Sequence, residues 1–444
     1  MGRRLVFLAA TFAFGCAGLA AAQANRTAPQ GGKGPATSGP QTGTFNGELK
    51  DDNGQFIIKY AAVVPKELPA QKTLALIVGL HGRGGNEKDQ LGAISGLLST
   101  CKLAKEYMVL GLKAKGESWA DEDHEPIAKA IAWALKEYPM DARRVYIWGY
   151  SSGAFGVGRF APRYQNLVAG GIMLAGGLWD PPKTEAAEQA LQLYLINGEK
   201  DPTVTAQTAH EACERLKAAK YRFVYRELTG ADHGLGGPGA TPVRLDAIRF
   251  IHALRNRTLP LSDDERKLVE GFTAKLQDGK TAPSPASFSR LLDLSGAEVD
   301  PLLALACQSE RREVRFAAAM LCQQRLYGKP ALDALVGLLE DKDSQVRAAA
   351  AHALSLAANW QYAEAVEALC AFAKNSAKPD SERMNAAGQL GLTVPLQLFC
   401  VNRDGAVFET LKTLSEDKNP QVKLAAKLGL EGKLLPDGQG FKIK

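Results

Sequence analysis

The chain has 444 residues, more than one hydrophobic core usually organises, so we expect two domains. Hydrophobic residues make up 45% of the sequence, which is typical of a globular protein. The net charge of +6 looks basic, but four of the positive charges, at Arg3, Arg4, Arg26 and Lys33, precede the first acidic residue. Because no run of Lys and Arg forms a basic face, we expect no nucleic-acid partner.

Residues 1–24 have the pattern of a signal peptide. A positive start, "MGRR", is followed by an apolar stretch over residues 5–21 and by small residues for signal peptidase at Ala20 to Ala24. An uncleaved anchor is one alternative, although an apolar stretch diluted with Ala and Gly is marginal for spanning a membrane. Lipidation at Cys16 is another, but "AFGC" departs from the usual lipidation motif. We expect a secreted or periplasmic protein with a cleaved signal peptide and no stable membrane span.

Residues 25–45 are rich in Gly, Pro, Ser and Thr and predict a disordered linker. Six cysteines remain after the signal peptide, without a CxxC pair and without His or Cys at zinc spacing, so we expect no metal site. Export permits disulfides, whereas the helical, buried-looking positions of several cysteines favour core thiols. The pairing stays open at this point.

Residues 46–257 alternate β-rich with helical segments. Several β-rich runs are apolar without period-two alternation, as in strands buried on both faces of a mostly parallel sheet. Helical runs at residues 121–138, 205–219 and 241–254 separate them, so the sequence predicts an α/β domain. The predicted strands are residues 55–64, 73–80, 107–114, 144–150, 167–176, 191–198 and 222–228.

The stretch "VYIWGYSSGAFGVG" places Ser151 between a predicted strand and a predicted helix. A Gly-x-Ser-x-Gly sequence in this context predicts a nucleophile elbow, a sharp turn that exposes a reactive serine. Gly149 and Gly153 keep open the space that side chains would fill at such a turn. The backbone N–H of Ser152 is a candidate donor to an oxyanion that forms when Ser151 attacks a carbonyl group.

A serine nucleophile needs a base and an acid. His233 lies in "TGADHGLGGPG", after the last predicted strand, where an imidazole can reach the carboxyl edge of the sheet. Asp201 follows the strand at residues 191–198, and the chain order Ser151, Asp201, His233 is that of an α/β-hydrolase triad. Asp201 also fits a turn or helix cap, and Asp232 competes for the role of the acid.

The loop "LHGRGGN" follows the predicted strand at residues 73–80. This is where an α/β-hydrolase places its second oxyanion donor, and the backbone N–H of Arg83 is our candidate. A plain glycine-rich turn is the alternative.

Together, "LHGRGGN", "GESWADED", "VYIWGYSSGA", "LINGEKDPTV" and "GADHG" resemble the α/β-hydrolase superfamily over residues 46–257. The resemblance is to the phospholipase/carboxylesterase branch and to the related feruloyl-esterase and polyhydroxybutyrate-depolymerase-like esterases. It implies carboxylic-ester hydrolysis by Ser151, Asp201 and His233, without metal or organic cofactor. "GYSSGA" departs from the "GFSQGG" of the first branch and leaves the substrate class open. Trp119 occupies a place where such esterases often have an aromatic residue near the acyl site, or is a core tryptophan.

The second half of the chain is helical and repetitive. Residues 258–285 predict a helix capped by "SDDE" and a linker, and residues 286–435 predict a HEAT-like repeat domain. Alanine pairs recur at Ala317, Ala349, Ala386 and Ala425, at spacings of 32, 37 and 39 residues, and residues 330–357 resemble one HEAT repeat. An ordinary helical bundle is the alternative. Because short repeats contact only their neighbours, we expect this part to fold without the first.

These features predict an exported serine esterase whose HEAT-like domain binds a protein or polymer partner. Two alternatives remain: a catalytically silent hydrolase fold whose helical domain does the binding, and a serine peptidase on the same fold. The intervals between the candidate site residues are filled by core elements, including a helix predicted at residues 183–190, so there is little room for a lid. We therefore expect an open site for short-acyl or polymer-linked esters.

Overall fold

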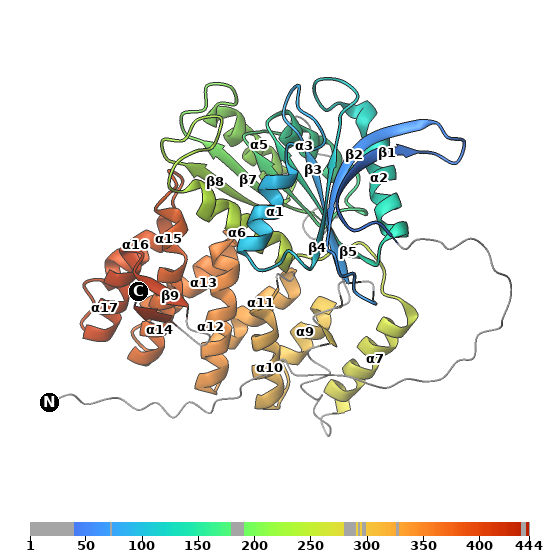
Figure 1. The fold of residues 1–444 in the computed structure, drawn as a ribbon. Coiled ribbons are helices and arrows are strands. Elements are labelled where there is room, and N and C mark those ends of the chain that lie inside the picture. Colours follow the sequence, from blue (N-terminus) through green and yellow to red (C-terminus); the bar gives the residue numbers. More distant parts are fainter. Residues whose placement is uncertain are drawn as a thin grey trace. The chain divides into compact units, whose positions relative to one another are not determined.

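An eight-stranded sheet dominates the first half of the protein. The computed structural model of the whole chain describes residues 40–71, 73–178, 191–278, 290–291, 294, 299–325, 328–436 and 441–443. The strands of the sheet follow the order β1-β2-β4-β3-β5-β6-β7-β8 (Figure 1). The pairs β1–β2 and β2–β4 are antiparallel, and all neighbours from β4 to β8 are parallel. The strands are β1 Gly43–Lys50, β2 Phe56–Val64, β3 Leu74–Leu80, β4 Tyr107–Leu112, β5 Met140–Tyr150, β6 Gly170–Leu174, β7 Gln192–Gly198 and β8 Arg222–Leu228.

Helices cover both faces of this sheet. Helices α1 (Leu91–Thr100) and α6 (Ala240–Ala253) pack on one face, and α2 (His124–Glu137), α3 (Ser152–Arg163) and α5 (Ala206–Ala218) pack on the other. A short 3₁₀ turn at Asp121–Asp123 precedes α2. Because neither face meets water, every residue of β3, β4, β6 and β7 is buried, which explains why these strands show no polar alternation.

All seven predicted strands and the three predicted helical runs are confirmed. Strand β1 was not predicted, and it begins at Gly43, three residues inside the predicted linker at residues 25–45. Its polar, half-exposed pattern, which suits an edge strand, carries no strong strand signal. The predicted signal peptide, Cys16 and the helix predicted at residues 183–190 lie outside the described residues.

The rest of the described chain is almost entirely helical. Helix α7 starts where "SDDE" predicts it, with the Ser262 N–H donating to Glu265 Oε2 at 2.7 Å. The linker predicted after α7 lies mostly outside the described residues. The elements are α7 Asp263–Asp278, α9 Val299–Cys307, α10 Arg312–Cys322, α11 Lys329–Gly337, η2 Leu338–Glu340, α12 Ser344–Asn359, α13 Ala363–Lys374, α14 Asp380–Leu392, α15 Val394–Gln397, α16 Gly405–Leu414 and α17 Pro420–Leu430, then a hairpin of β9 Leu434–Pro436 and β10 Phe441–Ile443.

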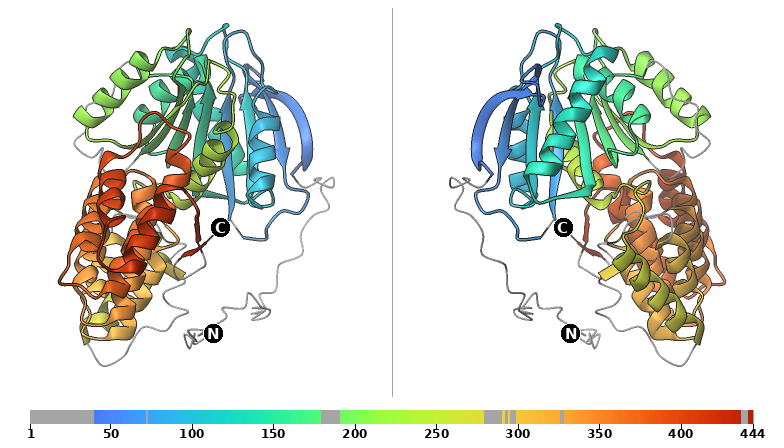
Figure 2. Two further views of the ribbon diagram at one scale, coloured as in Figure 1. Left: turned by 90° about the vertical axis from the view of Figure 1, so that its left-hand side faces the viewer. Right: turned by 90° about the vertical axis from the view of Figure 1, so that its right-hand side faces the viewer.

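The four alanine pairs fall on α10, α12, α14 and α17, which pack against one another in that order. In Figure 2 the helical repeats, coloured from yellow to red, stack into one array next to the sheet. The small side chains permit close approach, and α14 and α17 meet at Gly391 and Gly429. The fourth residue of α10, α12 and α14 is an arginine that pairs with an acidic residue of the following repeat: Arg315 with Asp341, Arg347 with Glu382 and Arg383 with Asp417. These pairs tie each repeat to the next. The repeat prediction is therefore confirmed, and its recurring arginine has a physical role.

A buried polar network joins α6 and β8 to the helical repeats. Asp246 on α6 accepts hydrogen bonds from Tyr194 at 2.6 Å, from Asn359 at 3.0 Å and from the indole of Trp360 at 3.2 Å. Arg226 on β8 lies 3.8 Å from the same carboxylate, with 1% of its side chain exposed. Residues 40–444 accordingly form one compact unit, and the domain boundaries near residues 258–285 stay a prediction.

Among the described residues, no helix combines the length and the apolar character that crossing a bilayer requires.

Candidate active site

Ser151 sits in a strained turn at the carboxyl end of β5. Its φ of 52° and ψ of −116° are unusual for a residue with a side chain, and such strain persists only where the surroundings impose it. The Ser151 N–H donates to the Leu174 carbonyl of β6 at 2.8 Å, which fixes the turn to the sheet. A Cβ atom at Gly149 would lie 2.1 Å from the Gly153 carbonyl oxygen, and one at Gly153 would lie 2.2 Å from the Leu80 carbonyl oxygen. Only glycine fits at either position, as predicted.

Three segments that are far apart in the sequence meet at Ser151. The Ser151 Oγ lies 3.0 Å from His233 Nε2, and His233 Nδ1 lies 2.8 Å from Asp201 Oδ2. The imidazole is about a quarter exposed, at 24%, whereas the Asp201 side chain is fully buried. The structure thus brings together the serine, histidine and aspartate that the sequence singled out.

Each oxygen of Asp201 has a separate task. Oδ1 accepts the backbone N–H groups of Thr203 and Val204, both at 2.8 Å, and Oδ2 faces the imidazole. The turn-capping and histidine-holding interpretations of Asp201 are therefore compatible. Asp232 instead accepts the backbone N–H of Gly234 at 3.0 Å and shapes the turn after His233.

The loop that holds His233 is supported from the sheet. Tyr150 donates its hydroxyl to the His233 carbonyl at 3.0 Å, and its ring lies 5.5 Å from the imidazole, centre to centre. Burial raises the pKa of the Tyr150 hydroxyl, which keeps it a donor. The guanidinium of Arg244 on α6 donates to the Leu235 carbonyl at 3.3 Å.

The loop after β3, which includes Arg83, passes beside the serine. A Cβ atom at Gly82 would lie 3.7 Å from Ser151 Cβ, so this backbone passes directly alongside the elbow. The N–H groups of Gly84 and Gly85 are used within the fold, by the carbonyls of Glu117 and Gly82. In the described part of the chain, no acceptor takes the N–H of Arg83 or of Ser152, the first residue of α3. Both candidate oxyanion donors are thus available for a ligand.

His81 orients the Arg83 peptide and was not singled out from the sequence. Its Nε2 accepts the Ala114 N–H at 3.1 Å, so the proton is on Nδ1, which donates to the Gly82 carbonyl at 2.6 Å. The N–H of Arg83 belongs to the same planar trans peptide as this carbonyl and points the opposite way. By holding the carbonyl, His81 fixes the direction of the Arg83 N–H.

Trp119 lies behind the elbow. Only 3% of it is exposed, its indole donates to the His81 carbonyl at 3.0 Å, and its backbone N–H donates to Ser152 Oγ at 3.2 Å. These contacts connect Trp119 to the loop after β3 and to the first residue of α3. A direct contact between Trp119 and a substrate stays a prediction.

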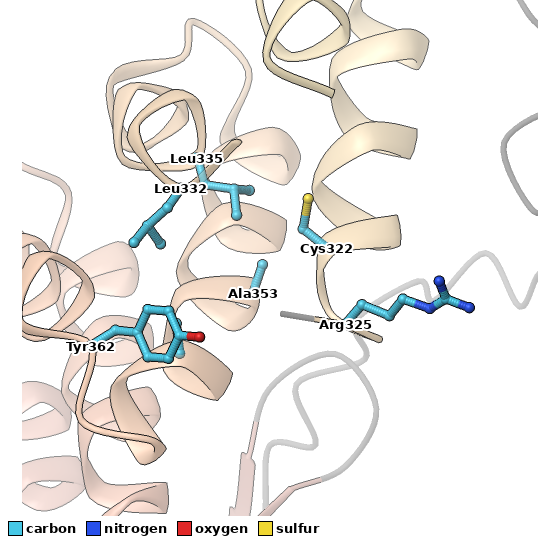
Figure 3. Close-up of a pocket in the computed structure, with 7 residues that line it drawn as sticks. Cys322, Arg325, Leu332, Leu335, Ala353 and Tyr362 are labelled. Atoms are coloured by element: carbon cyan, nitrogen blue, oxygen red, sulfur yellow. The ribbon is translucent and has the colours of Figure 1, made fainter. Parts of the chain in front are cut away.

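Other sites that could bind a ligand are sparse in the described chain. No cluster of three or more His, Cys, Asp and Glu side chains there is placed to hold a metal ion. All six described cysteines are free thiols, and burial raises the pKa of Cys213 and Cys307 to about 12. A cavity of about 20 Å³ between α10, α11 and α12, lined by Cys322, Leu332 and Ala353 among others, has room for about one water molecule (Figure 3).

The state of His81 predicts an acid sensitivity. Burial lowers the pKa of His81, so the unfolded chain binds a proton near pH 6.5 that the folded chain binds only at lower pH. Stability is therefore full above about pH 6.5 and falls as the pH drops towards the lowered pKa. Urea unfolding at pH 7.5 and 5.5 should show a smaller acid-induced loss for His81→Asn than for the wild type. An equal loss in the two proteins would contradict this account.

Two family models match the chain in separate places. Residues 107–243, which include Ser151, Asp201 and His233, match the dienelactone hydrolase family. Residues 299–391 match HEAT repeats.

The chain is also similar to acetylxylan esterases over a short segment. It is 46% identical to acetylxylan esterase A of Emericella nidulans and 40% identical to acetylxylan esterase A of Aspergillus oryzae, each over 50 residues, 11% of this chain. The match spans 16% of the length of either relative.

Among solved structures, a thermostable esterase covers 48% of this chain and 63% of its own, at 22% identity and a TM-score of 0.40. A ferulic acid esterase from Anaeromyces mucronatus covers 45% of this chain and 87% of its own, at 17% identity and a TM-score of 0.36. The chain carries an α/β-hydrolase fold that matches the dienelactone hydrolase family over residues 107–243, followed by HEAT-like helical repeats.

Proposed function

We propose that this protein is a serine hydrolase that cleaves carboxylic esters through an acyl-enzyme on Ser151. The observation that carries the proposal is the hydrogen-bonded chain from Ser151 through His233 to the buried Asp201, built on a strained elbow beside two available backbone N–H groups. A catalytically silent scaffold would need none of these features. The match to hydrolases over residues 107–243 supports the same activity.

In the first half-reaction, Ser151 Oγ attacks the ester carbonyl carbon while His233 Nε2 takes its proton. The carbonyl oxygen becomes an oxyanion that accepts the N–H groups of Ser152 and Arg83. Collapse of this intermediate breaks the bond to the alcohol, which leaves with the proton from His233. Asp201 holds the imidazole in the required tautomer and stabilises its positive charge. No step needs a metal or organic cofactor.

In the second half-reaction, water gives a proton to His233 and attacks the ester that joins the acyl group to Ser151. The same N–H groups stabilise the second oxyanion. The carboxylic acid then leaves, and the proton returns from His233 to Ser151 Oγ. The product pair is one alcohol and one acid for each water consumed.

For the substrate class, we propose short acyl groups, of which acetyl esters on a polysaccharide such as xylan are our first candidate. The similarity to acetylxylan esterases, although confined to 50 residues, supports an acetyl group. The predicted signal peptide supports export to the outside of the cell, where such polymers are found. A protein or polymer that binds the helical repeats would be met in the same place.

Replacing the nucleophile tests the proposal directly. Ser151→Ala removes the attacking oxygen, so turnover of 4-nitrophenyl acetate should fall on the order of a million-fold and labelling by a fluorophosphonate should disappear. Ser99→Ala, an exposed change on α1, should leave both unchanged. Labelling that mass spectrometry maps to Ser152 would move the nucleophile and overturn the assignment.

The identity of the acid gives a second test. Asp201→Asn keeps the shape of the side chain but cannot hold the required tautomer, so kcat should fall about ten-thousand-fold. Asp232→Asn keeps an oxygen for the Gly234 N–H and should cost little. Steady-state kinetics of both variants decide the matter, and the opposite ranking would assign the acid to Asp232.

Chain-length dependence tests the substrate class. In a series of nitrophenyl esters from acetate to palmitate, kcat/KM should gain less than about 0.8 kcal/mol for each methylene and stop rising after a few carbons. The rates should show no jump at the concentration where the esters form micelles. A rate that climbs with chain length and jumps at that threshold would identify a lipase instead.

A further inference from the structure

The loop that carries His233 is anchored at both ends by one segment of the helical repeats. This loop runs from Thr229, at the end of β8, to Gly239, just before α6. The Thr229 N–H donates to the Phe399 carbonyl at 3.0 Å. At the other end, a Cβ atom at Gly239 would lie only 2.6 Å from Phe399 Cβ, so the backbone there passes directly against this side chain.

The same segment continues along β8, the edge strand of the sheet. Val401 donates its N–H to the Glu227 carbonyl at 2.8 Å, and Leu228 and Cys400 form an antiparallel bridge. The Asn402 side chain accepts the Glu227 N–H at 2.9 Å and donates to the Tyr225 carbonyl at 2.7 Å.

A second amide completes the coverage of this edge. Gln361, between α12 and α13, accepts the Tyr225 N–H at 2.9 Å and donates to its carbonyl at 3.1 Å. The outward backbone groups of β8 from Tyr225 to Thr229 thus find their partners in the helical repeats, where an open edge would leave them to water or to another chain. The end of β8 that leads to His233 is therefore hydrogen-bonded to β7 on one side and to the helical repeats on the other.

The loop needs such anchoring. Residues 229–239 include five glycines, and glycine loses more conformational freedom on ordering than any other residue. From the sheet side, the loop is held by the Tyr150 hydroxyl on the His233 carbonyl. From the outside, its two ends rest on Phe399. A loop of this composition that loses one support spreads over more conformations, and fewer of them keep the 3.0 Å distance from His233 to Ser151.

We propose that Phe399 to Asn402 position His233, so that the helical repeats form part of the active-site scaffold as well as a surface for binding. Phe399 acts through the loop and does not touch the reacting atoms, so it is a positioning residue. This inference rests on the proposed ester hydrolysis.

The experiment uses the full chain with Phe399→Ala, which removes the ring that packs against Gly239. We expect kcat for 4-nitrophenyl acetate to fall by roughly tenfold to a hundredfold, because small misplacements of a catalytic group have costs of this size. KM should change less than about twofold, since the acyl and alcohol sites are not touched. Fluorophosphonate labelling of Ser151 should slow in parallel, and Phe399→Leu should restore most of the rate.

One control variant separates positioning from general destabilisation, and a second variant tests the other end of the segment. Phe316→Ala removes a partly buried ring on α10 of the same helical part, away from the loop, and should leave kcat unchanged at a temperature where circular dichroism shows all variants folded. Asn402→Ala, which leaves Phe399 in place, tests the rest of the segment and should also lower kcat, because the Asn402 amide pairs with the Glu227 N–H and the Tyr225 carbonyl.

The outcomes are distinct. An active wild type whose kcat is unchanged in Phe399→Ala, or lowered equally in Phe316→Ala, would overturn the positioning role and leave the proposed function intact. A wild type that hydrolyses no ester and takes no fluorophosphonate label would overturn the proposed function, and this inference with it.

Discussion

The backbone of Ser151 holds a positive φ of 52°, and the surrounding structure is arranged to impose it. The turn is possible because Gly149 and Gly153 have no side chains where the elbow meets the end of β3. The Ser151 N–H is tied to β6, and the first turn of α3 starts one residue later. A serine placed in this way stands above the sheet with its hydroxyl free to meet a histidine from another loop. The strain of about 1 to 3 kcal/mol is met by the packing of three adjacent strands.

The groups around Ser151 are set by hydrogen bonds one layer away from it. His81 fixes the peptide that presents the Arg83 N–H, Trp119 holds the His81 carbonyl, and Asp201 uses its second oxygen to anchor itself in its own turn. Each of these contacts is at least partly buried, and together they hold the groups around Ser151 in one arrangement. Preorganisation of this kind is what allows a polar site to stabilise charge that appears only during a reaction.

The helical repeats solve a problem of the sheet. A parallel sheet that ends at β8 exposes backbone groups along its last strand, and here the amides of Asn402 and Gln361 and the backbone from Phe399 to Val401 meet them. Asp246 and Arg226 add a buried polar connection between α6, β8 and the repeats. The edge that needs a partner is also the edge that leads to the His233 loop, so the contacts that close the sheet also meet both ends of this loop.

The sequence alone determined seven of the eight strands of the sheet, the elbow at Ser151, the loops that carry Asp201 and His233, and the helical repeats. These features leave local signals: unbroken apolar runs, glycines at fixed offsets from a serine, and alanine pairs at a repeating distance. Strand β1 was not predicted from the sequence, because a half-exposed edge strand lacks an apolar run. Only the tertiary structure decided which N–H groups stay available, which tautomer His81 adopts, and that Asn402 partners Glu227 from 175 residues away. Such contacts join segments distant along the chain, and a single sequence has no periodicity that records them.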